Sequence, residues 1–240
     1  MKGDKMLLKK PRTSEKDVIY LTLVDSISKG GCPICRTLEK SENNLIWIIL
    51  YEHVNDPYVR EKINKGNGLC GYHYKKVIDM AKQDPLIGGL GPAIIVEDLL
   101  SRFVESITTD TPLSTKCYIC SELEKTEDSY IASFVSKLDT TDLLSRYESN
   151  PESILCYKHF MEIYSRLPEA TAQKLKEIQL KKLNSLLGEL RSYIEKHDYR
   201  YIGTITENEA KSWTKAIEAL VGSGWSALFQ FKPKGKHSKK

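Results

Sequence analysis

The sequence predicts an all-α protein, built as a tandem duplication of one helical zinc-binding unit and followed by C-terminal helices. Two observations predict the helices: apolar residues recur at helical spacing along most of the chain, and no segment alternates as a strand does. A third predicts the duplication, because the second half repeats the first at an offset of 85 or 86 residues.

Cysteines and histidines define the repeat. In each copy a Cys-x-x-Cys pair is followed, after 34 or 35 residues, by the cysteine of a Leu-Cys-x-x-His sequence. Leu-Glu-Lys follows both Cys-x-x-Cys pairs, and Glu42 of the first copy matches Glu127 of the second. All six cysteines belong to this pattern, whose members are Cys32, Cys35, Cys70 and His73 in the first copy and Cys117, Cys120, Cys156 and His159 in the second.

The helices of the first copy are predicted from caps, breakers and apolar stripes. Thr13 or Ser14 can cap a first helix, and Pro57 suits the first turn of a short one that ends at a Lys-Gly-Asn-Gly sequence. Three further helices are expected over 36–53, 70–83 and 92–107.

The second copy repeats this plan and adds a longer helix. Helices are expected over 121–138, 140–148, 156–166 and 169–196, and a final helix over 207–221. The predicted organisation is therefore a basic N-terminal tail at 1–12, repeats at 13–110 and 111–203, a C-terminal helix and apolar segment at 204–231, and a basic tail at 232–240.

Charge is distributed unevenly along the chain. The net charge is +4, but residues 1–12 hold five basic residues against one acid, and residues 232–240 hold five lysines and no acid. The body between the tails is therefore net acidic. Such tails either keep a protein soluble or bind phosphate groups through electrostatic attraction.

The cysteines point to metal or redox chemistry. No secretory leader and no apolar run of about 18 residues is present, so we expect a cytoplasmic protein without a membrane span. Structural disulfides are rare in that reducing compartment. Cys-x-x-Cys with Cys-x-x-His supplies the four ligands of a closed structural zinc site, so two Zn²⁺ sites are predicted. An iron–sulfur cluster or a thiol redox pair remains open.

Loop closure favours metal sites that form within each copy. A helix over 36–53 is about 27 Å long, and residues 54–69 can return over that distance. Cys70 and His73 would then meet Cys32 and Cys35, although exchange of ligand pairs between the copies stays possible.

Other candidate sites are weaker. Glu52 and Glu97 either support a zinc ligand or lie on the surface. The C-terminal segment holds Trp225, Leu228, Phe229 and Phe231. It packs on the helical body, forms a stacking arm beside the C-terminal lysines, or acts as an amphipathic anchor to a membrane surface or a partner.

Several stretches together resemble an uncharacterised family of helical prokaryotic proteins, a domain of unknown function. They are CPICRTLEK, LYEHVNDPYVREKI, GLCGYH, the glycine-rich turn before AIIVEDLL, and SWTKAIEALVG. The resemblance implies an architecture but no activity, and the second copy matches mainly at its ligands.

No nucleophile–base pair, paired-carboxylate motif or dinucleotide fingerprint stands out. The sequence therefore predicts a non-enzymatic zinc-binding interaction scaffold, with the basic tails contacting RNA, DNA or a nucleoprotein. A protein partner is the other possibility, and a thiol–disulfide or iron–sulfur redox protein is the alternative function.

Overall fold

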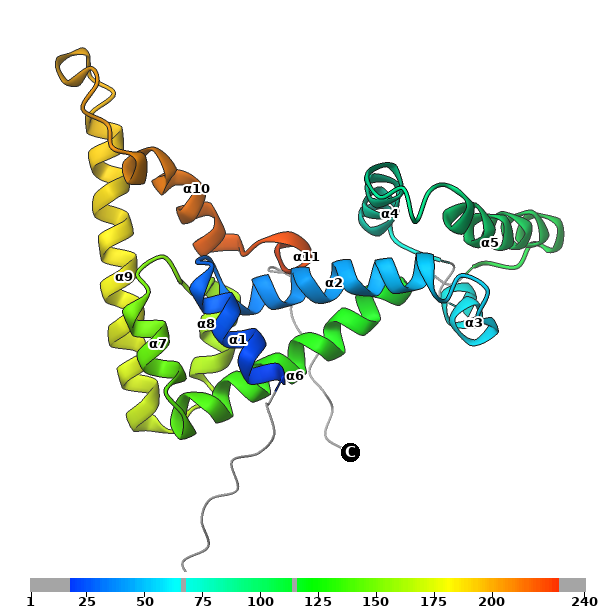
Figure 1. Cartoon of the computed structure of the whole chain (residues 1–240), viewed down its shortest axis with the longest axis horizontal. Coiled ribbons are helices and arrows are strands. Elements are labelled where there is room, and N and C mark those ends of the chain that lie inside the picture. The colour runs from blue at the N-terminus through cyan, green and yellow to red at the C-terminus, as the bar shows by residue number, and fades with distance from the viewer. Residues whose placement is uncertain (1–17, 66–67, 114–115, 229–240) are drawn as a thin grey trace, which may run out of the picture.

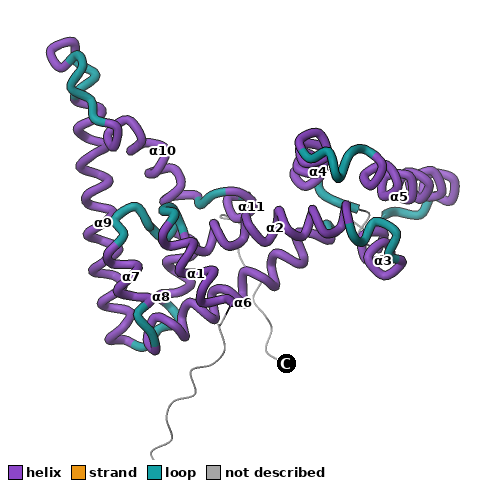
Figure 2. Tube along the Cα trace, viewed as in Figure 1, coloured by secondary structure: helices purple, strands orange, loops and turns teal. Residues whose placement is uncertain are grey.

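The computed structural model describes residues 18–65, 68–113 and 116–228. Within these residues the regular elements are helices, apart from one isolated β-bridge between Gly31 and Ser153 (Figures 1 and 2). The all-α prediction is confirmed. The two basic tails lie outside the described residues.

The helices follow the predicted order. The first half contains α1 (Val18–Ser28), α2 (Pro33–Tyr51), α3 (Pro57–Lys65), α4 (Gly71–Gln83) and α5 (Leu90–Thr109). The second half contains α6 (Tyr118–Thr140), α7 (Leu143–Ser149), α8 (Tyr157–Tyr164), α9 (Glu169–Glu195), a 3-10 turn (Tyr199–Tyr201), α10 (Glu207–Val221) and α11 (Gly224–Ala227).

Helices α2 and α6 each begin three residues earlier than predicted, inside the Cys-x-x-Cys motif. Cys32 and Cys117 occupy the N-cap positions in extended backbone conformations, and the helix starts at the next residue. Pro33 suits this first helical position, because the N–H that proline lacks would have no partner inside the helix.

The centre of the molecule is an antiparallel pair formed by α2 and α6, with α1 packed against both (Figure 1). Each helix of the pair turns a fully buried apolar face inward, as shown by Leu38 and Ile46 on α2 and by Ile131 and Phe134 on α6. Helices α3, α4 and α5 gather at one end of this pair, and α7 to α10 gather at the other (Figure 1).

None of the helices is both long enough and apolar enough to cross a membrane, among the residues that the structure describes.

Candidate metal centres

All four ligand motifs stand at helix N-termini. The first cysteine of each motif is the N-cap residue of its helix, which places Cys32 before α2, Cys70 before α4, Cys117 before α6 and Cys156 before α8. None of these cysteines makes a side-chain capping hydrogen bond, so each sulfur is free to face a second helix terminus. The second residue of each motif lies one turn further on and therefore points to the same side.

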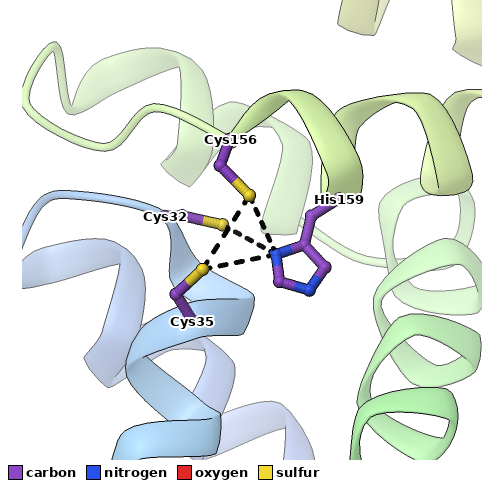
Figure 3. Close-up of side chains that lie close together, drawn as sticks. All are labelled: Cys32, Cys35, Cys156 and His159. Atoms are coloured by element: carbon purple, nitrogen blue, oxygen red, sulfur yellow. Dashed lines mark hydrogen bonds between the residues drawn. The ribbon is translucent and has the colours of Figure 1, made fainter. Parts of the chain in front are cut away.

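The first centre joins the start of α2 to the start of α8. Figure 3 shows Cys32 and Cys35 on one side and Cys156 and His159 on the other, with all four side chains pointing to one spot. The Nδ1 atom of His159 lies 3.3, 3.4 and 3.2 Å from the sulfurs of Cys32, Cys35 and Cys156, respectively. All four residues are buried, with exposed fractions of 3% or less.

The second centre joins the start of α4 to the start of α6 in the same manner. The Nδ1 atom of His73 lies 3.2 Å from the sulfurs of both Cys70 and Cys117 and 3.5 Å from that of Cys120. His73 and Cys117 are buried, whereas Cys70 and Cys120 are partly exposed.

Distances between the donor atoms fit a tetrahedral metal ion. Zinc ligands at about 2.3 Å for sulfur and 2.0–2.1 Å for nitrogen stand about 3.8 Å apart for two sulfurs and about 3.6 Å apart for sulfur and nitrogen. The sulfurs of Cys35 and Cys156 are 3.8 Å apart, as are those of Cys70 and Cys120. This separation is far longer than the disulfide bond length of about 2.0 Å. The two groups could therefore each hold a metal ion with four protein ligands.

The expected pairing of ligands within each copy is wrong. Each centre takes its Cys-x-x-Cys pair from one copy and its Cys-x-x-His pair from the other. The chain that returns from α2 places His73 beside Glu42. Glu42 lies ten residues after Cys32, which is about 15 Å along the axis of α2, so His73 stays far from Cys32. Because α6 runs antiparallel to α2, its own Cys-x-x-Cys pair arrives at that point and completes the centre.

Backbone contacts join the two copies next to each centre. Gly31 donates to the Glu152 carbonyl at 2.8 Å, and its own carbonyl accepts from Ile154 at 3.0 Å, just before the two ligand motifs. At the other centre, Tyr118 donates to the Gly68 carbonyl at 3.4 Å. Each pair of motifs is therefore held together by main-chain hydrogen bonds as well as by its side chains.

Two buried glutamates orient the ligand histidines. The Nε2 atom of His73 lies 3.0 Å from Glu42, and that of His159 lies 2.9 Å from Glu127. With Nε2 turned to a carboxylate, each ring presents Nδ1 to the sulfurs, which is the usual support of a metal-bound histidine. The candidates Glu52 and Glu97 are both exposed and belong to the surface. The signal that identifies Glu42 and Glu127 is that they match each other at the offset of the cysteine pairs.

A lysine ammonium also contacts each of these two glutamates. Lys76 lies 2.6 Å from Glu42, and Lys158 lies 2.6 Å from Glu127. Burial raises the pKa of Glu127, but hydrogen bonds from His159 and Lys158 outweigh it and lower this pKa to about 2. Burial likewise raises the pKa of Glu42, but contacts with His73 and Lys76 outweigh it and lower this pKa, so both carboxylates are ionised at neutral pH.

The surroundings of Cys117 favour a thiolate, whereas the Cys117 sulfur beside it raises the pKa of Cys120. The pKa of Cys117 is far below its usual range, because the Cys120 thiol and His73 donate to its sulfur. Helix N-termini add to this effect, since their free N–H groups and dipoles stabilise negative charge. Thiolate is the form of cysteine that binds metals.

The C-terminal apolar segment packs on the helical body as far as it is described. Trp225 is only 2% exposed, whereas Leu228, the last described residue, is half exposed. Phe231 lies outside the described residues.

An apolar groove lies between α8, α9 and α10. Its volume is about 590 Å³, and its lining includes Phe160, Leu183, Leu187 and Leu220. The apolar face of α9 is therefore covered over only part of its length, because Leu180 and Leu187 are exposed whereas Leu175 and Leu186 are buried.

The fold and the two clusters define a class: helical proteins with a duplicated Cys₃His centre. The chain belongs to the family described as Family of unknown function (DUF6062), whose model matches residues 15–113 and 101–226. Each matched stretch holds one Cys-x-x-Cys and one Cys-x-x-His motif, which is consistent with a duplication. The resemblance to a family of unknown function is confirmed.

One curated relative covers most of the chain. The protein named "Uncharacterized 23.9 kDa protein in xynA 3'region", from Caldicellulosiruptor sp. (strain Rt8B.4), is 25% identical over 210 residues, which span 84% of this chain and 100% of that protein. No solved structure matches the chain.

Proposed function

We propose that the protein is a non-enzymatic, cytoplasmic interaction scaffold whose fold is held by two structural Zn²⁺ ions. The observation that carries this proposal is the closure of both centres. Three sulfurs and one imidazole nitrogen surround each centre at tetrahedral separations. A catalytic zinc site keeps one position open for water or substrate, and four protein ligands leave none.

Energetics support a structural role. The two ions would fasten α2 to α8 and α4 to α6. A structural zinc ion contributes about 10–16 kcal/mol of apparent binding free energy in small peptides at neutral pH. This is comparable to the whole stability of a domain, about 5–15 kcal/mol.

Metal analysis of the purified protein, combined with its absorbance spectrum, tests this proposal. We expect two zinc ions per chain and no visible colour, because Zn²⁺ has a filled d shell. Bound iron with visible absorbance would overturn the proposal in favour of the iron–sulfur alternative. Metal-free protein with intact helices and disulfides between its cysteines would favour the thiol–disulfide alternative.

Metal removal tests the structural role separately. When a chelator has removed both ions, the far-UV circular dichroism signal of the helices should collapse, and it should return when zinc is added. An unchanged helix signal in protein that metal analysis shows to be metal-free would contradict a structural role.

For the partner, we propose RNA, DNA or a nucleoprotein. The support is the sequence alone, in which five basic residues stand in 1–12 and five lysines in 232–240. Lysine and arginine displace counterions from nucleic acid phosphates, so the affinity should fall steeply as the salt concentration rises.

Electrophoretic or fluorescence binding assays over a range of salt concentrations test this partner. Binding should be lost when both tails are deleted from the full chain. Salt-sensitive binding that survives the deletion would place the contact elsewhere, and no binding by the intact chain would indicate a protein partner.

A further inference from the structure

We propose that the segment from Gly222 to Trp225 clamps both metal centres, positioning a sulfur ligand in each and making their metal occupancies interdependent. This inference rests on the proposed function, because it concerns how the same two centres hold their ions. The segment follows α10 and leads into α11, which packs against α2.

The backbone of Gly222 lies directly against the sulfurs of the first centre. A Cβ atom placed at Gly222 would stand only 3.2 Å from the Cys35 sulfur and 3.4 Å from the Cys156 sulfur. Gly222 also has a φ of 76°, in the left-handed region that residues with a side chain rarely adopt. Glycine is therefore required twice over: for the turn that ends α10 and for the approach to the sulfurs.

Three residues later, Trp225 reaches the second centre. Its indole N–H donates a hydrogen bond to the Cys120 sulfur, with a nitrogen–sulfur distance of 3.4 Å. Because Trp225 is almost fully buried, the donor of this hydrogen bond is shielded from water, whereas Cys120 is partly exposed. A donor on a thiolate sulfur stabilises its negative charge and fixes its direction.

A charged residue extends the contact of Trp225 back to the first centre. The Lys158 ammonium lies 5.7 Å from the centroid of a Trp225 ring and 2.6 Å from Glu127, which holds His159. The chain His159–Glu127–Lys158–Trp225–Cys120 thus connects a ligand of one centre to a ligand of the other. Loss of metal at either end would free a ligand that this chain helps to position.

Cobalt and zinc derivatives of the full chain test the role of Trp225. In Trp225→Phe an aromatic ring remains, but the indole N–H donor is lost. We expect the thiolate-to-cobalt charge-transfer band to move to lower energy, and one of the two zinc ions to pass to a chromophoric chelator about tenfold faster. Trp213→Phe is the matched control, because Trp213 is 48% exposed. A Trp225→Phe protein that matches this control in both measurements would overturn the role of Trp225.

Gly222→Ala tests the other half of the clamp. We expect faster release of the ion held by Cys32, Cys35, Cys156 and His159, identified by which cysteines become open to alkylation. Gly203→Ala is the control for backbone strain, because Gly203 has a similar φ of 78° but no atom within 4 Å of an added Cβ. Equal release rates in these two variants would show that the contact with the sulfurs has no role.

Interdependence is measured by combining variants. In the wild-type background, His159→Gln should speed zinc release from the second centre, and in the Trp225→Phe background this effect should be smaller. Equal effects in both backgrounds would contradict the coupling. Failure of the proposed function is recognised separately, because the wild-type protein would then hold no zinc at all.

Discussion

At the scale of single residues, Glu127 and Glu42 show why each histidine can serve as a ligand. A histidine buried without a partner would be free to turn, whereas a carboxylate on Nε2 fixes both the ring and its tautomer. The side chains of His159 and Glu127 are 0% and 6% exposed, so no water is available to replace this contact.

Replacing Glu127 should therefore weaken one centre selectively. We expect Glu127→Gln to lower the zinc affinity of the centre that contains His159 by about 10-fold to 100-fold. Competition with a chelator of known affinity measures the change. Glu124→Gln, at an exposed position of the same helix, is the control and should keep the wild-type affinity. Equal affinities in the two variants would show that Glu127 does not support the ligand.

The two groups of residues that could hold a metal ion could be selected from the sequence, but the carboxylates beside their histidines could not. Spacing identifies Cys32, Cys35 and their counterparts because a metal site requires pairs of donors one turn apart. Glu52 and Glu97 were candidates only because their neighbours in the sequence are apolar, and both side chains are exposed in the structure. Which face of α2 meets the ligand histidine depends on where α4 docks against it, and this is a property of the tertiary structure.

At the scale of elements, α9 supports the loop that leads to Cys156. The Lys182 ammonium donates to the carbonyl of Tyr147, in the last turn of α7, and to those of Asn150 and Ser153 in the loop. Burial lowers the pKa of Lys182 to about 8, so the side chain remains mostly charged at pH 7. One lysine therefore satisfies several backbone acceptors that a tight loop cannot pair internally.

Loss of this lysine should destabilise the protein. We expect Lys182→Met to lower the free energy of unfolding by about 1–3 kcal/mol, because it leaves the carbonyls without a donor. Urea denaturation of the zinc-loaded protein measures the change, and Lys181→Met, at an exposed position of α9, is the control. A Lys182→Met protein as stable as the control would refute this role.

The start of α10 carries a capping box. The Thr206 side chain accepts from the Glu209 N–H, and the Glu209 carboxylate accepts from the Thr206 N–H while also binding Lys196. The hydrogen bond from Lys196, followed by those from Ser192 and from the Thr206 N–H, lowers the pKa of Glu209 to about 2.

This carboxylate should make stability depend on pH. A folded-state pKa below the unfolded value of about 4.5 stabilises the fold above pH 4.5, and this contribution is lost as the pH falls towards 2. The difference in melting temperature between the wild type and Glu209→Gln should therefore be largest near neutral pH and shrink below pH 4.5. A difference that stays constant down to pH 3 would contradict the argument.

Most elements were predictable because their signals are local. Pro57 and the Lys-Gly-Asn-Gly sequence bracket α3, and α9 and α10 begin at the predicted residues. Helix α11 was not predicted, because four residues are too few for periodicity and Trp225 is ordered by burial rather than by local propensity.

At the scale of the whole molecule, the two copies exchange ligand pairs across the antiparallel helices α2 and α6. Neither copy can complete a Cys₃His set alone in this arrangement, so the duplication is needed for both centres. Loop-closure entropy favours the shorter route within a copy only weakly, since doubling a loop costs only about 0.6 kcal/mol. The packing of two long helices outweighs so small a preference, and the sequence does not reveal how those helices align.

Cysteine alkylation mapped by mass spectrometry in the zinc-loaded His159→Gln protein tests the exchange most directly. Loss of His159 opens its centre, so the cysteines that share it should react first. The structure predicts that Cys32 and Cys35 are alkylated well before Cys117 and Cys120. Rapid alkylation of Cys117 and Cys120, with Cys32 and Cys35 protected, would show that each copy closes its own centre and would contradict this account.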